Sequence, residues 1–271
     1  MTQRLFDSMH EIADRVAHAP HLLVCLDFDG TLTPIVANPA DAFLDPKTHD
    51  VVAKLAGHEH VTVAIVSGRT RSDLLARVEL PGLIYAGNHG LEISGPGFVF
   101  IEPTAAGCRD ELHTLATELT NRLSGIPNIF VEDKGLTISV HDRRVPAEHL
   151  DEVRRLVHAT LANSRHPFQL TPGDRIYDIR PRVAWDKGVA VSWIRKQMGQ
   201  SNALAVYLGD DATDEDAFAG LRDEITIKVG PNGETVAHYR LESCEDVRQF
   251  LRWLLSAWSG GQGARSGHVR V

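Results

Sequence analysis

The sequence is poor in cysteine, in long apolar runs and in positive charge, and each shortage excludes a class of protein. Its 271 residues include three cysteines without a CxxC pair, which argues against a disulfide framework and a zinc site. No apolar run approaches the roughly 18–20 residues of a membrane-spanning helix. Asp and Glu outnumber Lys and Arg by 36 to 28. Because such a surface repels phosphate backbones and anionic lipids, we expect a cytoplasmic protein with no nucleic-acid or membrane partner.

Two further patterns are missing. The chain has no repeat of solenoid type and no GxxxxGK[ST] segment, so a P-loop nucleotide site is excluded. Hydrophobic residues make up 43% of the chain and charged residues 24%, which is typical of a globular enzyme. Only residues 259–271 are glycine-rich and unpatterned, and we expect this tail to be disordered.

Most of the chain alternates between apolar runs that predict buried strands and periodic segments that predict helices. The expected strands are residues 21–27, 61–66, 83–86, 203–208 and 225–229. The expected helices are residues 47–55, 71–78, 187–198, 214–221 and 245–258. Continuously apolar strands that alternate with helices predict an α/β fold with a parallel sheet covered on both faces.

The middle of the chain breaks this alternation. Its expected elements are a helix (109–123), two strands (129–132 and 137–141), a second helix (147–162) and two more strands (168–170 and 176–179). Two helix–strand–strand units in succession predict a small antiparallel sheet with helices on one face. We therefore expect a core of residues 1–104 and 181–258, interrupted by an α+β module of residues 105–180.

The first candidate site is Asp27-Phe28-Asp29, directly after an apolar strand. Two carboxylates two residues apart on extended chain point to the same side, at the end of a parallel strand where α/β sheets bind ligands. A divalent cation would relieve their repulsion, and hard oxygen ligands favour Mg²⁺. One carboxylate could then attack phosphorus while the other moves a proton. The alternative is an acidic turn that merely closes the strand.

A second acidic segment, Gly209-Asp210-Asp211-Ala212-Thr213-Asp214, follows another apolar strand. Asp210 and Asp214 would flank the turn into the next helix and offer more oxygen ligands to a metal. The alternative is a helix N-cap, where acidic residues favour the positive end of the helix dipole. Two acidic strand ends in one parallel sheet favour the metal site.

Two further segments could hold a phosphate group. Ser67-Gly68-Arg69 follows the strand 61–66, where a hydroxyl and backbone N–H groups at a helix N-terminus can bind an anion. Lys187 begins the helix after the inserted module and could supply a point charge for a phosphoryl oxygen. Taken singly, each is also compatible with an ordinary solvated side chain.

Together these four segments resemble, in order, the motifs of the haloacid-dehalogenase (HAD)-like phosphatase superfamily. The resemblance implies a Rossmannoid parallel-sheet core with an inserted α+β cap. It implies that Asp27 is the nucleophile, Asp29 the acid/base and Lys187 a further catalytic residue. It implies that Mg²⁺ is bound by Asp27, Asp29, Asp210, Asp211 and Asp214.

Finer stretches resemble the trehalose-6-phosphate phosphatase family, namely Gly87-Asn88-His89-Gly90-Leu91-Glu92, Val131-Glu132-Asp133-Lys134-Gly135, and residues 209–218. The resemblance implies that Glu132 and Lys134 contact sugar hydroxyls, together with Asp178, which stands where this family usually has Glu. The substrate-binding residues predicted in all are Gly30, Thr31, Ser67, Gly68, Arg69, His89, Glu132, Lys134 and Asp178. The alternatives are an exposed ion pair for Glu132 and Lys134, and a local hydrogen bond in the turn for His89.

The resemblance implies Mg²⁺-dependent hydrolysis of trehalose 6-phosphate through an aspartyl-phosphate, and a functional link to a trehalose-6-phosphate synthase. The nearest alternative is a phosphatase for another sugar phosphate, such as sucrose phosphate or mannosyl-phosphoglycerate. A phosphotransferase of the phosphomannomutase type uses related chemistry. An alternative of another class is a catalytically idle regulatory or binding protein with the same fold.

Overall fold

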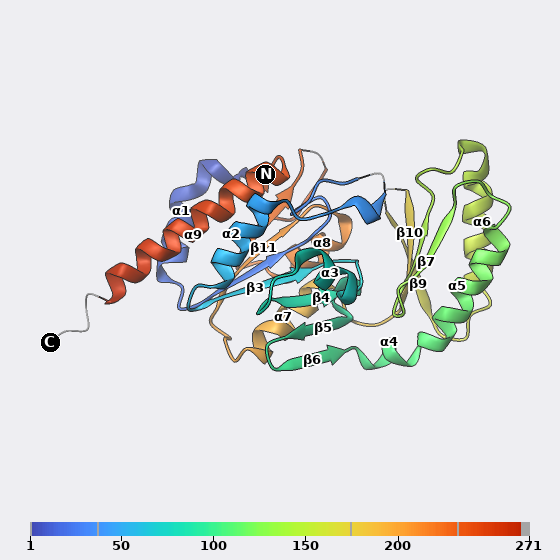
Figure 1. The fold of residues 1–271 in the computed structure, drawn as a ribbon, viewed down its shortest axis with the longest axis horizontal. Coiled ribbons are helices and arrows are strands. Elements are labelled where there is room, and N and C mark those ends of the chain that lie inside the picture. Colours follow the sequence, from blue (N-terminus) through green and yellow to red (C-terminus); the bar gives the residue numbers. More distant parts are fainter. Residues whose placement is uncertain (1, 37, 174, 232, 267–271) are drawn as a thin grey trace. The chain divides into compact units, whose positions relative to one another are not determined.

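The computed structural model describes residues 2–36, 38–173, 175–231 and 233–266, and the chain divides into two units (Figure 1). Unit 1 consists of Met1–Val99 and Trp185–Val271, and unit 2 of Phe100–Ala184. Unit 2 is therefore one insertion into the chain of unit 1. Its bounds lie a few residues outside the expected module of residues 105–180.

Unit 1 is built on a sheet with β2 near its middle. In spatial order its strands are β1 (Gln3–Arg4), β13 (Tyr239–Leu241), β12 (Ile225–Val229), β11 (Leu204–Gly209), β2 (Leu22–Leu26), β3 (Val61–Val66), β4 (Ile84–Gly87), β5 (Glu92–Gly95) and β6 (Phe98–Ile101), the last of which begins in unit 1 and ends in unit 2. The pairs from β1 to β4 are all parallel, which confirms the predicted parallel core. The sheet is mixed rather than purely parallel, because β5 runs antiparallel to β4.

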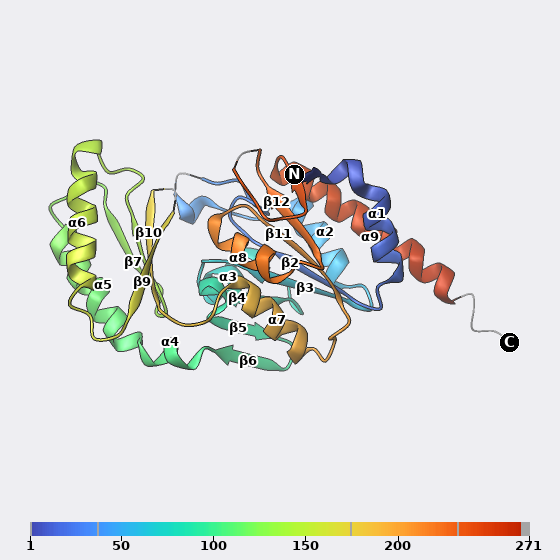
Figure 2. The same ribbon diagram turned by 180° about the vertical axis from the view of Figure 1, so that it is seen from behind.

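Helices cover both faces of this sheet, as continuously apolar strands require. They are α1 (Met9–His18), α2 (Pro46–Ala56), α3 (Arg71–Val78), α7 (Lys187–Gln197), α8 (Ala212–Gly220) and α9 (Cys244–Ser266), with short 3₁₀ turns η1 (Leu5–Ser8), η2 (Pro39–Asp41) and η3 (Asn88–Gly90). Figure 1 shows α1, α2 and α9 beside one another, and the reverse view in Figure 2 brings α7 and α8 forward.

Alternate side chains of the central strands supply the two buried layers. Leu22, Val24 and Leu26 belong to a core shared with α1, α2 and α9. Tyr207 of β11 packs on Phe218 of α8, with ring centroids 5.8 Å apart. Because side chains alternate along a strand, one residue beyond Leu26 brings the chain to the face that α7 and α8 cover.

The last helix corrects one expectation. α9 extends to Ser266, so residues 259–266 are helical rather than disordered, and residues 267–271 lie outside the described part. The buried side chains of Phe250, Leu254 and Trp258 hold the helix on the core. Each added residue then contributes one more helical hydrogen bond, although glycine weakens a helix by about 1 kcal/mol. Among the described residues, no helix is both long and apolar enough to cross a bilayer.

Unit 2 has the predicted α+β arrangement. Its antiparallel strands lie in the order β7 (Phe130–Asp133), β8 (Ile138–His141), β10 (Ile176–Pro181) and β9 (Phe168–Gly173). Its helices are α4 (Pro103–Gly107), α5 (Arg109–Leu123) and α6 (Leu150–Leu161), with the 3₁₀ turn η4 (Ala147–His149). Apolar side chains of α5 and α6 pack on Ile138, Val140 and Ile179 of the sheet. The alternate positions, which include Ser139 and Asp178, therefore face away from the helices.

Candidate active site

Three of the predicted segments end neighbouring parallel strands of unit 1. Asp27 follows β2, Ser67 follows β3, and Asp210 follows β11, while β2 pairs with both of the other strands. The N–H of Asp27 donates to the Leu208 carbonyl at 2.9 Å, which extends the β2–β11 ladder to the site. The carboxyl ends of parallel strands form one edge of the sheet, where α/β folds bind their ligands.

Carboxylates gather at this edge. Asp27, Asp210 and Asp214 each place one oxygen within 4.8 Å of the others. Burial raises the pKa of Asp27 well above its usual range, although Lys187 opposes the shift. Burial and the charges of Asp214 and Asp211 raise the pKa of Asp210 to about 7. Carboxylates that resist ionisation beside one another form an oxygen-only donor set, the chemistry that Mg²⁺ prefers.

Lys187 provides the positive charge within this cluster. Its side chain is 1% exposed, and its Nζ donates to Asp27 Oδ1 at 2.9 Å and to Asp214 Oδ1 at 2.7 Å. Burial opposes the charge, but Asp211, Asp214 and Asp27 outweigh it and raise the pKa of Lys187 well above its usual range. Asp186 caps the N-terminus of α7 by accepting the Val189 N–H, which fixes the position of Lys187.

Asp211 lies outside this carboxylate cluster, although the sequence predicted it among the metal ligands. It is the N-cap of α8, where its Oδ1 accepts the backbone N–H of Thr213 at 2.8 Å and of Asp214 at 3.1 Å. The Asp214 side chain accepts the Asp211 N–H in return, which completes a capping box. Asp211 therefore caps the helix, as one of the two interpretations predicted, while Asp210 and Asp214 lie close to Asp27, and a metal site there stays a prediction.

Sequence reasoning missed two residues that hold the acidic motif. Tyr207 donates its hydroxyl to Asp214 Oδ1 at 2.7 Å, and Lys228 Nζ donates to the Asp210 carbonyl at 2.5 Å. Tyr207 lies within an apolar strand, where nothing marks it as polar in function. Lys228 does leave a signal, because a lysine within the otherwise apolar strand β12 needs a partner when it is buried.

Gly30 lets the chain after Asp29 approach the acidic motif. Its φ is +83°, and a Cβ at this position would lie 2.0 Å from Asp210 Oδ2. Thr31, the next residue, has its hydroxyl 3.5 Å from Asp210 Oδ1. Gly30 and Thr31, both predicted to bind substrate, are thus placed beside the carboxylates, and only glycine fits at the first position.

The Ser67-Gly68-Arg69 loop is held by the turn that contains His89. The N–H groups of His89 and Asn88 donate to the carbonyls of Ser67 at 2.9 Å and Arg69 at 2.7 Å. The His89 ring packs so closely that a Cβ on Gly68 would lie 2.7 Å from its Cε1. His89, in left-handed backbone with φ of 59°, therefore shapes this loop, and its contact with substrate stays a prediction.

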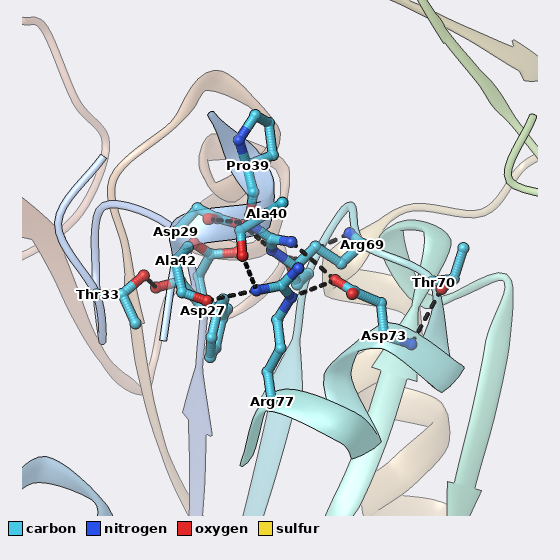
Figure 3. Close-up of polar contacts among 12 residues, drawn as sticks. Asp27, Asp29, Thr33, Pro39, Ala40, Ala42, Arg69, Thr70, Asp73 and Arg77 are labelled. Carbon is cyan, nitrogen blue, oxygen red and sulfur yellow. Dashed lines mark hydrogen bonds and ion pairs between the residues drawn. The ribbon is translucent and has the colours of Figure 1, made fainter. Parts of the chain in front are cut away.

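Arg69 contacts an acidic side chain of the site itself. Its Nε donates to Asp29 Oδ2 at 2.6 Å and its Nη2 to Asp29 Oδ1 at 2.7 Å, a bidentate pair (Figure 3). Its guanidinium also lies over the Phe28 ring, 5.4 Å from the centroid. The sequence predicted Arg69 as a substrate-binding residue, but in the structure these donors are engaged by the predicted acid/base.

In unit 2, the predicted sugar-binding residues come together on the helix-free face of the sheet. Ser139 lies opposite Glu132 on one side and Asp178 on the other. Lys134 Nζ is 4.0 Å from both Glu132 Oε2 and Asp178 Oδ1. Ser139 donates to Asp178, and His141 Nε2 lies 2.9 Å from Glu132 Oε2. Sequence reasoning missed Ser139 and His141, although they alternate with apolar residues in β8 and so share this face.

Comparisons with known proteins agree with the motifs. A family model described as trehalose-phosphatase matches residues 25–244. The chain is 37% identical over 236 residues to the trehalose-phosphate phosphatase of Mycobacterium tuberculosis (strain ATCC 25618 / H37Rv), with 84% of this chain and 59% of that protein covered. It is 34% identical over 268 residues to trehalose 6-phosphate phosphatase RA3 of Zea mays, with 88% and 71% covered.

A solved structure is also similar. The crystal structure of a trehalose-6-phosphate phosphatase related protein matches with a TM-score of 0.77 and 25% identity, over 86% of this chain and 97% of that one. The chain spans about three fifths of the length of its mycobacterial relative, 59%. The family match includes every residue of the site described above.

Proposed function

The chain belongs to the trehalose-phosphatase family, and from this we propose that it hydrolyses trehalose 6-phosphate to trehalose and inorganic phosphate. The observation that carries the proposal is the buried Asp27 carboxylate, bound by Lys187 at the carboxyl end of β2 and adjoined by further carboxylates. This arrangement suits nucleophilic attack on a phosphate ester. The proposal also links the chain functionally to a trehalose-6-phosphate synthase, which makes the substrate.

Asp27 is the nucleophile of the proposed reaction. One of its carboxylate oxygens attacks phosphorus, the bond from phosphorus to the sugar oxygen breaks, and an aspartyl-phosphate forms on Asp27. Lys187 supports this role because its Nζ, 2.9 Å from Asp27 Oδ1, holds the carboxylate in one orientation and favours the anion. Ser67 and Lys187 hold phosphoryl oxygens, on which charge spreads in the transition state.

Asp29 moves the proton in both halves of the reaction. It first gives a proton to the departing sugar oxygen, which is a poor leaving group as an alkoxide. It then takes a proton from the water that attacks phosphorus, which breaks the bond to Asp27 and releases phosphate. The Asp29 side chain is 38% exposed, whereas that of Asp27 is 6% exposed, which supports this division of roles because Asp29 can exchange a proton with water.

The residues at the strand ends also fit a Mg²⁺ ion. Asp27, Asp210 and Asp214 would hold it through carboxylate oxygens, and Asp29 through its backbone carbonyl. Burial, together with repulsion between the carboxylates, raises the pKa values of Asp27, Asp210 and Asp214, and a divalent cation would favour the ionised form of each. When bound, Mg²⁺ supplies positive charge that offsets the repulsion between the Asp27 carboxylate and the phosphate.

Selection of the sugar is assigned to the polar face of unit 2. The core motifs alone could hydrolyse any phosphate ester that reaches Asp27, so recognition of a disaccharide needs other groups. Glu132, Lys134 and Asp178 form a cluster of donors and acceptors suited to sugar hydroxyls. Asp178 is one methylene shorter than the Glu usual in this family, but its bond from Ser139 fixes its carboxylate beside Lys134.

The test is a measurement of phosphate release from trehalose 6-phosphate beside sucrose 6-phosphate, mannosyl-phosphoglycerate and glucose 6-phosphate, each with and without Mg²⁺. We expect the highest kcat/KM for trehalose 6-phosphate and reversible loss of activity on chelation. A higher kcat/KM for another ester would reassign the substrate. Release of a sugar-phosphate isomer in place of phosphate would indicate a phosphotransferase, and absence of any turnover would indicate an idle binding protein.

A further inference from the structure

A chain of alternating charges leads from Asp29 into helix α3 (Figure 3). Arg69 holds both oxygens of Asp29 through Nε and Nη2, and its Nη1 donates to Asp73 Oδ2 at 2.7 Å. Arg77 Nε donates to the same Asp73 oxygen at 2.7 Å. Asp73 thus lies between the guanidinium groups of Arg69 and Arg77, and that of Arg69 also binds Asp29, the predicted acid/base.

Both arginines are also fixed to backbone around η2. Arg69 Nη2 donates to the Pro39 carbonyl at 2.9 Å. Arg77 Nη1 donates to the carbonyls of Ala42 at 2.6 Å and Ala40 at 3.1 Å. Their side chains are 11% and 12% exposed, whereas that of Asp29 is 38% exposed. Both guanidinium groups are therefore held in place, whereas the carboxyl groups that they contact are partly open to solvent: Asp29, which Arg69 holds, and Asp73, which is 35% exposed.

Asp73 is itself fixed by the start of α3. Thr70 is the N-cap of this helix, and its hydroxyl accepts the Asp73 N–H at 3.1 Å. Arg77 follows one turn later on the same face. Burial opposes ionisation of Asp73, but hydrogen bonds from Arg77 and Arg69 outweigh it and lower its pKa. Asp73 is therefore held by the start of the helix and by Arg77, and its contact with Arg69 Nη1 limits rotation of the Arg69 guanidinium.

The plane of Arg69 matters for proton transfer. A bidentate guanidinium fixes both oxygens of a carboxylate, which a lysine at the same place would not do. If Arg69 turned, Asp29 would lose the two hydrogen bonds that Arg69 donates to its carboxyl oxygens, and it could rotate about its own side-chain bonds. A misplacement of about 1 Å can cost about 100-fold in rate, so loss of the contacts that hold Arg69 should be visible in kinetics.

We propose that Asp73 is a positioning residue, which orients Arg69 and through it the Asp29 carboxylate for proton transfer to the leaving oxygen. Arg77 fixes Asp73 in the same way. The proposal rests on the acid/base role of Asp29 in the proposed function. In this proposal Arg69 orients Asp29, a role that the Ser67-Gly68-Arg69 pattern did not indicate.

The test is the dependence of kcat/KM on the leaving group in Asp73→Asn. The substrates are aryl phosphates, from p-nitrophenyl to phenyl, and a simple alkyl phosphate. None of them carries a sugar, so altered sugar binding cannot contribute. Nitrophenolate is stable enough to depart without a proton, whereas an alkoxide must be protonated as it leaves. We therefore expect little change in kcat/KM for p-nitrophenyl phosphate. For the alkyl ester we expect a loss approaching about 100-fold. The plot of log kcat/KM against leaving-group pKa should become steeper.

Two reference variants separate the outcomes. Asp29→Asn should steepen the plot most, and Asp50→Asn, which removes an exposed pair with Lys54 on α2, should leave it unchanged. An equal loss on every substrate, or wild-type rates throughout, in Asp73→Asn would overturn the proposal while leaving the acid role of Asp29 intact. An unchanged slope in Asp29→Asn would refute that acid role, and this inference with it.

A second variant guards against misfolding. Asp73→Asn keeps the backbone N–H that Thr70 caps, so we expect the thermal midpoint to remain close to that of the wild type. If it does not, Arg77→Gln removes the other anchor of Asp73 without touching Arg69. It should steepen the same plot, by less than Asp73→Asn. A folded Arg77→Gln protein with the wild-type slope would count against the proposal.

Discussion

Replacing Lys187 with methionine is expected to destabilise unit 1 by removing the cation from a buried carboxylate cluster. The Lys187 side chain is 1% exposed and its Nζ lies within 2.9 Å of both Asp27 and Asp214. Methionine keeps most of the apolar volume, so the change removes charge and hydrogen bonds rather than creating a large cavity. The carboxylates then remain buried without their partner.

The magnitude follows from what is left unpaired. Breaking a buried ion pair by removing one partner costs about 3–5 kcal/mol, because the other charge stays desolvated. Lys187 bonds to two buried carboxylates and lies 3.7 Å from Asp211 Oδ1, so we expect the upper part of this range in the metal-free protein. With a total stability of about 5–15 kcal/mol for a typical domain, such a loss is large enough to measure by urea unfolding.

The loss should depend on pH with a definite sign. Burial raises the pKa of Asp214 to about 6 despite Lys187, and that of Asp210 to about 7. A carboxylate with a raised folded-state pKa binds more protons folded than unfolded, so stability falls as pH rises through the window from about 4 to about 7. Without Lys187 these pKa values rise further. The penalty in Lys187→Met should therefore be small at about pH 4 and should keep growing as pH rises through about 7, because the variant's carboxylates ionise only at higher pH.

The assay is urea unfolding of wild type and Lys187→Met at both ends of this window, with EDTA or with Mg²⁺. Lys54→Met, at an exposed pair with Asp50, is the matched control and should change stability by less than about 0.5 kcal/mol. Because a bound cation replaces part of the lost charge, Mg²⁺ should recover part of the stability of the variant. A loss below about 1 kcal/mol at neutral pH, or one independent of pH, would refute this reasoning.

Three further predictions concern turnover. Asp27→Asn should abolish phosphate release, measured by a phosphate assay, because an amide cannot form the acyl-phosphate. The protein should stay folded, measured by thermal unfolding, because the repulsion between carboxylates falls. Gly30→Ala should raise the Mg²⁺ concentration needed for activity, since its Cβ would displace the Asp210 carboxylate. Glu132→Ala and Lys134→Ala should lower kcat/KM for trehalose 6-phosphate by orders of magnitude but spare an aryl phosphate, because a site that binds hydroxyls loses much when a partner is missing.

Each of these predictions has an outcome that contradicts it. Full activity in Asp27→Asn would remove it as nucleophile, and an unchanged Mg²⁺ titration in Gly30→Ala would remove Asp210 from the metal site. For unit 2 the control is Glu118→Ala, which breaks an exposed pair with Arg122 on α5. Equal losses on both substrates in Glu132→Ala would show a structural role rather than recognition of the sugar.

The parallel core could be predicted because burial on both faces leaves an unbroken apolar run. Residues 61–66 and 225–229 were predicted with the bounds that β3 and β12 have. The strands β5 and β6 were missed because they lie at one end of the sheet, β6 as its edge strand and β5 beside it, and only Ile93 of the two is buried, so neither forms an unbroken apolar run. Val99 of β6, for example, is exposed. With three residues, β13 is too short to show any period.

The candidate site could be predicted only as far as chain order determines position. A strand end fixes where Asp27, Ser67 and Asp210 lie, because parallel strands bring their carboxyl ends to one edge. Chain order does not determine which charged side chains pair with one another in the folded protein. Arg69 follows a strand as a phosphate-binding residue would, yet its guanidinium binds Asp29 and Asp73, two acidic side chains that the fold brings within reach. A guanidinium stays charged and donates hydrogen bonds to carboxyl oxygens beside it, so it has partners before substrate arrives. The polar partners of a site residue therefore come from the tertiary structure, whereas the location of that residue already follows from the strands.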